Sequence, residues 1–180
     1  MKLWAAITQA FAGWLLIVRG KPDWQSHFAL SLPGLVTALL IFVLAAFLAV
    51  VFASMSIGLP SLPGVLAAMV VLALPLVAFV LALLGTRMVL KTDELLLPLL
   101  VPATYVLTAF LLIEGLLAML GGPIVMLAWI ALAFVLFCLA RAATSWNIGV
   151  SFCFAVLSVV LLVALRLALY MLSSSAGITI

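Results

Sequence analysis

The chain has 180 residues, of which 71% are hydrophobic and 6% are charged, and its formal net charge is +3. A soluble domain carries roughly a quarter charged residues, so the seven Lys/Arg and four Asp/Glu side chains are too few to cover a water-facing surface. Because the basic residues are scattered along the chain, the composition also argues against a nucleic-acid partner. These properties predict an all-α integral membrane protein that forms one domain over residues 1–180, with no separate soluble catalytic domain.

Residues 1–32 are predicted to form an N-terminal segment on the cytoplasmic side of the membrane. Residues 3–18 are apolar but shorter than the roughly 20 residues that a spanning helix needs. Apolar and aromatic side chains recur along one face of this stretch at helical spacing, namely Trp4, Ile7, Phe11, Trp14 and Val18. The pattern predicts an amphipathic helix that lies in the membrane plane with this face in the acyl boundary. The alternative is a short sixth span.

Five spanning helices are predicted after this segment, at about residues 33–53, 63–85, 95–119, 124–140 and 148–172. The N-terminal segment holds three Lys/Arg residues, and the following loops and tail hold zero, two, zero, one and zero. This alternation predicts a cytoplasmic N-terminus and an outside C-terminus, because loops rich in Lys and Arg stay in the cytoplasm. We expect a bacterial inner-membrane protein. Tryptophans suited to anchoring at the membrane–water interface are Trp4, Trp14, Trp24 and Trp146.

Helix-breaking residues fall inside two of the predicted spans. Pro75 lies in the second, and Pro98 and Pro102 lie near the cytoplasmic end of the third, where we expect a kink or a locally unwound turn. Such a feature is either an ordinary bend, which the sequence favours, or a hinge or broken-helix binding site.

A short similarity recurs 30 residues apart, in which Ser-Leu-Pro-Gly precedes a span at both 31–34 and 61–64. Ser followed by Pro is a helix-start signal, and this is our interpretation of both copies. An internal repeat of the kind found in transporters is the alternative.

Two ionisable residues lie within the spans, and both sit in the outer part of the bilayer. Glu114 is 19 residues past Leu95, and Arg166 is 18 residues past Ile148, so two helices of the same direction carry them to similar heights. Because charges within spans are costly and usually paired, we predict an interhelical ion pair. The alternative is that each side chain reaches separately to the outer interface. Since the faces that carry them are apolar toward the cytoplasm, a structural role is favoured over transport.

Residues suited to enzyme chemistry are scarce. Cys138 and Cys153 match no metal or redox spacing and are interpreted as packing residues near the cytoplasmic face. His27 is the single histidine, and the adjacent Asp93 and Glu94 fit helix-start charges better than an acid–base pair. We find no phosphate-binding glycine loop and no nucleophile motif. The sequence predicts no catalytic residue, no metal site and no cofactor.

The stretch Gly20-Lys-Pro-Asp-Trp24, followed by Ser31-Leu-Pro-Gly34 at the entrance to the first span, carries a resemblance to a known family. With its N-terminal interfacial segment and five closely spaced spans, the chain resembles the Yip1-like group and other small polytopic bacterial membrane proteins. The Asp-Leu-Tyr-Gly-Pro-type motif of the eukaryotic members is missing. The resemblance therefore implies architecture and carries over no functional residue.

The sequence favours a membrane protein without catalysis that acts as an accessory or scaffold subunit or as a membrane-organising protein. A small permease or transporter component, acting as an oligomer or with a partner, is the alternative. An enzyme acting on lipid is the least favoured interpretation. Expected partners are the lipid bilayer and either a second membrane protein or further copies of the chain.

Overall fold

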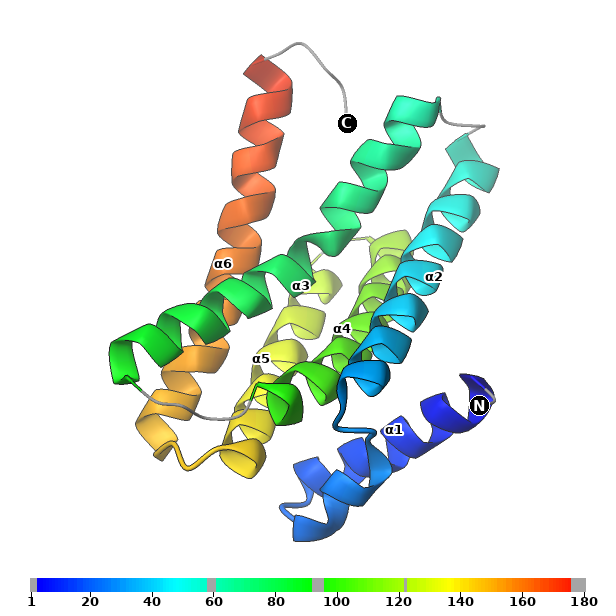
Figure 1. Cartoon of the computed structure of the whole chain (residues 1–180). Helices are drawn as coiled ribbons and strands as arrows, with labels where there is room; N and C mark the ends of the chain where they lie inside the picture. Colours follow the sequence, from blue (N-terminus) through cyan, green and yellow to red (C-terminus); the bar gives the residue numbers. More distant parts are fainter. Residues whose placement is uncertain (1–2, 58–60, 92–95, 122, 176–180) are drawn as a thin grey trace.

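The computed structural model describes residues 3–57, 61–91, 96–121 and 123–175, which are almost entirely helical (Figure 1). In chain order the elements are α1 (Leu3–Val18), the 3-10 helix η1 (Pro22–His27), α2 (Leu32–Ile57), α3 (Leu62–Leu90), α4 (Leu97–Leu120), α5 (Ile124–Ala143) and α6 (Ile148–Ser175). Helices α2 to α6 are each long and apolar enough to cross a membrane. The all-α prediction of five spans and a short N-terminal helix is confirmed, and the chain is an integral membrane protein.

Helix α3 runs five residues beyond the predicted end of its span. Arg87 lies in its last turn, where a cation interacts favourably with the C-terminal end of the helix dipole. Lys91 closes the helix in the left-handed conformation, with φ 51° and ψ 42°. The helix continues past Gly85 because no proline follows that residue to stop it. Asp93 and Glu94, expected at the start of the next helix, lie outside the described residues.

The five long helices pack in the order α2, α4, α5, α6, α3, and the contact between α2 and α3 that closes this ring is much looser than the others. Consecutive helices run in opposite directions (Figure 1). We call the end of the bundle that carries α1 and the α5–α6 loop the α1 end. The opposite end, where α2 finishes, α3 starts and α6 finishes, we call the far end. Arg19, Lys21, Arg87, Lys91 and Arg141 all lie at the α1 end.

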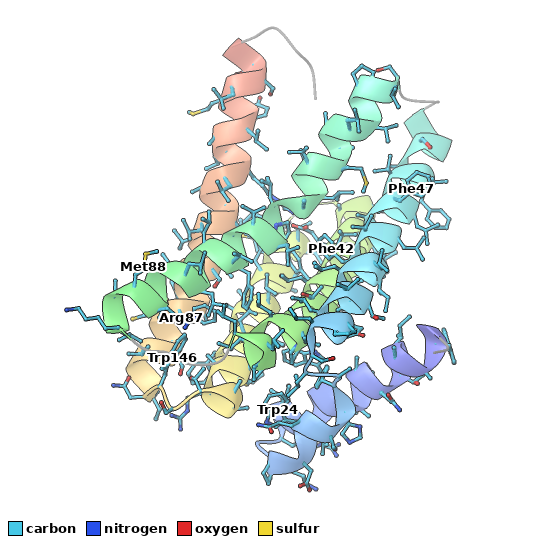
Figure 2. All side chains as sticks on the ribbon, viewed as in Figure 1. Trp24, Phe42, Phe47, Arg87, Met88 and Trp146 are labelled. Carbon is cyan, nitrogen blue, oxygen red and sulfur yellow. The ribbon has the colours of Figure 1, made fainter. Side chains whose placement is uncertain are left out.

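Apolar side chains cover the outside of the bundle as well as its interior. On α2, Phe42 is buried against the other helices, whereas Phe47 is 49% exposed and points away from them (Figure 2). A helix that is apolar all round suits a membrane, because lipid tails solvate its outer face. The exposed apolar residues therefore mark the lipid-facing surface.

Helix α1 packs across the α1 end of the bundle against α4 and α5 (Figure 1) and is shorter than the helices that are long enough to span a membrane. At about 1.5 Å per residue its 16 residues reach about 24 Å, which is short of a bilayer core. Trp4, Phe11 and Val18 are exposed along its outer face. This arrangement supports the in-plane interpretation over a sixth span.

The two Ser-Leu-Pro-Gly copies both begin helices, as predicted. The Ser31 hydroxyl accepts a hydrogen bond from the Gly34 amide at 3.3 Å, and the Ser61 hydroxyl accepts one from the Gly64 amide at the same distance. Each serine thereby satisfies one of the amides that the first turn of a helix leaves free. Because α2 and α3 run in opposite directions, the two caps lie at opposite ends of the bundle.

The prolines leave α4 without an unwound turn, which was one of the two predicted outcomes. Helix α4 is continuous from Leu97 to Leu120, with Pro98 in its first turn, where an amide has no helical partner anyway, and with Pro102 inside it. Helix α3 instead changes direction near its middle (Figure 1), where Pro75 removes one backbone hydrogen bond and its ring crowds the preceding turn.

Candidate functional site

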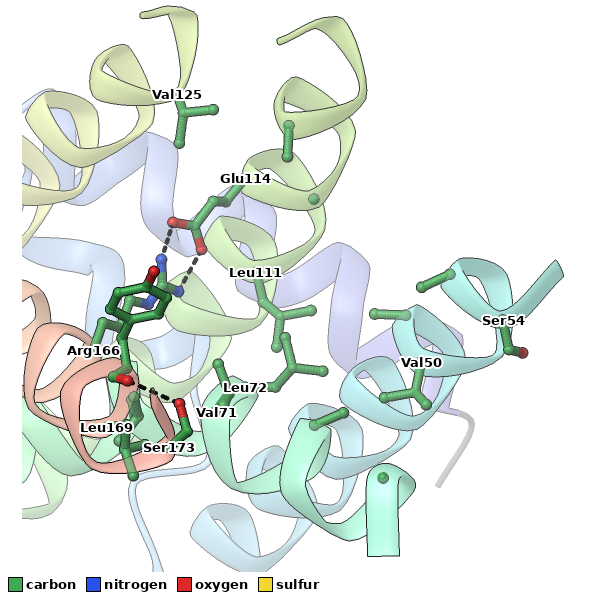
Figure 3. A pocket seen from close by; sticks show the side chains of 18 of the residues that line it. Val50, Ser54, Val71, Leu72, Leu111, Glu114, Val125, Arg166, Leu169 and Ser173 are labelled. Atoms are coloured by element: carbon green, nitrogen blue, oxygen red, sulfur yellow. Dashed lines mark hydrogen bonds and ion pairs between the residues drawn. The ribbon is translucent and has the colours of Figure 1, made fainter. Parts of the chain in front are cut away.

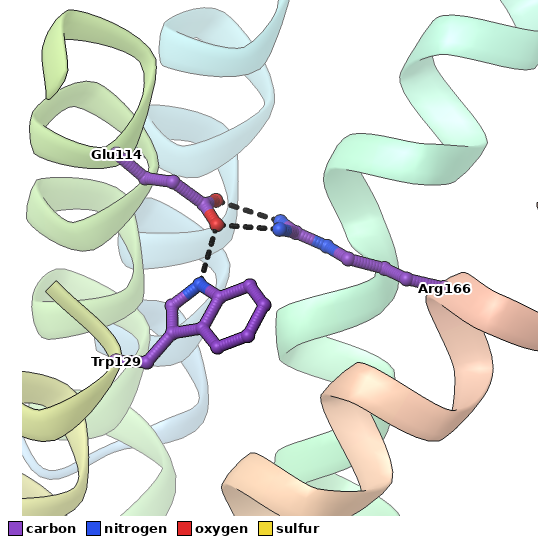
Figure 4. Close-up of polar contacts among 3 residues, drawn as sticks. All are labelled: Glu114, Trp129 and Arg166. Atoms are coloured by element: carbon purple, nitrogen blue, oxygen red, sulfur yellow. Dashed lines mark hydrogen bonds and ion pairs between the residues drawn. The ribbon is translucent and has the colours of Figure 1, made fainter. Parts of the chain in front are cut away.

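A closed polar cluster lies inside the bundle toward the far end. Glu114 on α4 and Arg166 on α6 form the predicted ion pair as a two-pronged contact (Figure 4). Arg166 Nη1 donates to Glu114 Oε1, and Arg166 Nη2 donates to Glu114 Oε2 at 2.7 Å. The carboxylate side chain is 12% exposed and the guanidinium side chain 25%. A bidentate pair of this kind is the strongest form of carboxylate–arginine contact.

Trp129 on α5 is the third member of the cluster and was not predicted. Its indole Nε1 donates to Glu114 Oε1 at 2.8 Å (Figure 4). The sequence carried a signal for this contact in the tight turn between α4 and α5. Glu114 lies six residues before the end of α4, and Trp129 lies five residues after the start of α5. Two antiparallel helices joined by so short a turn place these residues at one height.

The cluster forms one wall of a cavity of about 860 Å³ that touches all five long helices (Figure 3). Most of its lining is apolar, and six of the lining residues are alanine or glycine, namely Ala49, Ala53, Gly64, Ala68, Gly115 and Ala118. The cavity is open to its surroundings, because several lining residues are themselves exposed. The cavity was not predictable from the sequence, because a void depends on how far helices diverge.

The bend at Pro75 separates the packed half of α3 from the half that lines the cavity. The α3 residues at the cavity all lie between Gly64 and Leu74. Past the bend, Phe79 is 1% exposed and stands edge-on to Phe154 of α6, with ring centroids 5.6 Å apart. From this crossing α3 and α6 diverge toward the far end (Figure 1), which leaves space between them.

The hydroxyl groups inside the spans mostly bond to their own helices. Thr104 Oγ1 donates to the Leu100 carbonyl and Thr108 Oγ1 to the Thr104 carbonyl, both at 2.8 Å. Ser158 Oγ donates to the Phe154 carbonyl at 2.9 Å. Such bonds satisfy polar groups that lipid cannot solvate. Among the described residues, these hydroxyls do not continue the polar cluster toward the α1 end.

The anchor prediction is contradicted by burial for three of the four tryptophans and stays a prediction for Trp4. Trp4 is 75% exposed, whereas Trp14, Trp24 and Trp146 are 9%, 2% and 5% exposed and contact protein instead of the membrane–water interface. Trp14 Nε1 donates to the Pro102 carbonyl of α4 at 3.2 Å. The physical reason differs between them: α1 docks on α4 and α5 and buries Trp14, Trp24 is buried beside Phe28, and Trp146 is buried against Phe154 of α6. A helical-face pattern cannot reveal such contacts.

Trp24 and Trp146, labelled in Figure 2, each pack against a phenylalanine. Trp24 lies edge-on to Phe28 with ring centroids 6.1 Å apart, and Trp146 lies edge-on to Phe154 at 5.5 Å. The Trp146 carbonyl also accepts a hydrogen bond from Arg141 Nη1 at 3.1 Å. These contacts give both rings a role in packing the α1 end.

The remaining candidate groups do not assemble into a reactive centre. Cys138 and Cys153 are free thiols on α5 and α6. His27 ends η1 at the α1 end, away from Glu114. In the part of the chain that the structure describes, no three His, Cys, Asp or Glu side chains are grouped to hold a metal ion. The site offers one polar cluster and an apolar cavity, an arrangement suited to binding.

Comparison of this chain with protein-family models, with curated proteins and with solved structures gives no match.

Proposed function

We propose that the chain is a non-catalytic component of the bacterial inner membrane, acting as an accessory subunit or a membrane-organising protein. The observation that carries this proposal is that both oxygens of the Glu114 carboxylate have partners within the cluster. Both carboxylate oxygens of Glu114 accept bonds from Arg166, and one of them also accepts from Trp129. A group that relays protons or ions needs further polar partners along its path. The resemblance in architecture to the Yip1-like group fits the same proposal.

A permease component is the second candidate, and the cavity is the observation that favours it. The cavity connects Glu114 and Arg166 to the far end of the bundle. The half of the bundle nearer α1, however, is filled by large apolar side chains, and Phe79, Leu107 and Leu136 are each 1% exposed. A polar substrate would have to cross this packed layer. We therefore place transport second.

Purification in mild detergent with quantitative identification of co-purifying proteins tests the first proposal. We expect one membrane protein in near-equal amount, and an unrelated polytopic protein with the same tag is the control. Recovery of the chain alone would contradict a subunit role. The second step is to replace Gly115, at the cavity wall, by cysteine and to add a membrane-impermeant thiol reagent. If the chain is recovered alone and this cysteine reacts, the cavity is open to water and the permease proposal would replace the subunit proposal.

We further propose that the N-terminus and the α1 end face the cytoplasm. Support comes from the loop cations, since Arg19, Lys21, Arg87, Lys91 and Arg141 share one end of the bundle. Single cysteines at Lys91 and at Pro123, in a background of Cys138→Ala and Cys153→Ser, test the orientation in intact cells. We expect an impermeant maleimide to label position 123 from outside and position 91 only after lysis. The reverse pattern would overturn the orientation.

A further inference from the structure

The cavity lies in a membrane-spanning bundle that is surrounded by lipid, and one of its walls is polar. Its α3 and α6 walls diverge toward the far end (Figure 1), and the lining residues Ala68 and Val71 on α3 are partly exposed and Tyr170 on α6 is exposed, so that lipid can reach the cavity from this side. Ligand sites in proteins are mostly apolar spaces of about 300–1,000 Å³ with a few placed polar groups. A cavity of about 860 Å³ with a polar cluster at one wall has these properties.

The charge balance of the cluster restricts what this wall can bind. Glu114 and Arg166 neutralise each other, so a ligand that brought a further net charge would be left without a counter-ion in an apolar surrounding. Arg166 Nε is buried and has no hydrogen-bond partner among the described residues. The pair with Glu114 uses two of the five guanidinium N–H groups, and the Arg166 side chain is 25% exposed, so that donors remain for an uncharged oxygen acceptor.

The depth of the cluster favours the same class of ligand. Glu114 lies six residues before the end of α4, which corresponds to about 9 Å along the helix. A charged phosphate headgroup would have to leave the interface and lose water to reach that depth. An ester, ketone or hydroxyl oxygen is desolvated at much lower cost.

We propose that this cavity is a binding site for a neutral membrane lipid. The apolar chain lies between the far halves of α3 and α6, along Ala68, Val71 and Leu169, and an uncharged oxygen accepts a hydrogen bond from Arg166. This site is separate from the proposed subunit role and does not depend on it.

Two glycines provide a matched pair of variants for the test. A Cβ at Gly115 or at Gly85 would have no protein atom outside its own helix turn within 4 Å, so a larger side chain fits at both positions. Gly115 lines the cavity, and Gly85 lies on α3 past the Pro75 bend and is not part of the lining. Gly115→Leu therefore fills the cavity, whereas Gly85→Leu makes the same change elsewhere.

Trp129, as part of the polar wall, reports occupancy by its fluorescence, measured as the difference between the wild type and Trp129→Phe. The protein in phosphatidylcholine nanodiscs is titrated with a brominated diacylglycerol, and brominated phosphatidylcholine at equal bromine content is the comparison. We expect saturable quenching by the diacylglycerol alone. Gly115→Leu should weaken its apparent affinity about tenfold or more, equivalent to at least about 1.4 kcal/mol, and Gly85→Leu should leave it unchanged.

Several results would overturn the proposal. Equal quenching by both brominated lipids would mean bulk lipid contact only, and equal affinity of the two glycine variants would place the lipid elsewhere. A third result would be a membrane protein that co-purifies with the chain and has to be removed before the diacylglycerol quenches Trp129. That result would assign the cavity to a helix of the partner. If Gly115→Leu fails to fold, Ala68→Leu takes its place, and native mass spectrometry of the wild type detects the bound neutral lipid without any variant.

Discussion

Glu114→Arg and Arg166→Glu are each expected to destabilise the protein strongly, and the double exchange is expected to restore much of the loss. Breaking a buried pair leaves one charge without a partner, at a cost of about 3–5 kcal/mol. For a chain of this size, that cost corresponds to a fall of roughly 10 °C or more in the melting temperature. Each variant is purified at equal detergent concentration, and thermal unfolding is followed by circular dichroism.

The double exchange distinguishes the pair from two independent charges. If Glu114 and Arg166 act through each other, the summed losses of the single variants will exceed the loss of the double variant by well over 1 kcal/mol. Recovery will be incomplete, because Arg at position 114 cannot accept the hydrogen bond from Trp129. Strictly additive losses would show that each side chain reaches the interface separately, and the structural role of the pair would be abandoned.

Gly34→Ala is expected to produce the second large effect, at the junction between η1 and α2. A Cβ at Gly34 would lie 1.8 Å from the Ala29 carbonyl oxygen, which is a backbone atom and has little freedom to move. That oxygen also accepts a hydrogen bond from the Ser31 amide at 2.8 Å. Overpacking costs typically about 1–3 kcal/mol, and a clash with backbone belongs at the upper end of that range. Detergent melting curves measure the loss.

Gly85→Ala is the control for Gly34→Ala, because the Cβ at position 85 meets nothing within 4 Å. Replacing a helix glycine that has free space by alanine is neutral or stabilises the helix by up to about 1 kcal/mol. We expect the two variants to differ in melting temperature by several degrees and in opposite directions from the wild type. Equal melting temperatures would mean that the chain before α2 can move away from Gly34 at no cost.

The number of spans, the helix starts and the ion pair were predictable because each depends on local or one-dimensional properties. Five apolar stretches of sufficient length determine the spans. Ser31 and Ser61 act as caps through bonds three residues along the chain. Glu114 and Arg166 could be predicted to lie at the same depth in the membrane, because spanning helices run roughly parallel to one another and rise by a fixed distance per residue.

Only the tertiary structure decided which faces the helices present to one another. Trp14 belongs to the same sequence stripe as Trp4, yet docking of α1 on α4 buries Trp14 and leaves Trp4 exposed. The cavity depends on the divergence of α3 and α6 on the far-end side of Pro75, which no pattern within one helix encodes. In lipid the inner and outer faces of a helix are both apolar, so hydrophobic periodicity is too weak to specify which face packs against a neighbour. The sequence by itself therefore determines the spans, and the fit between side chains of different helices determines the site.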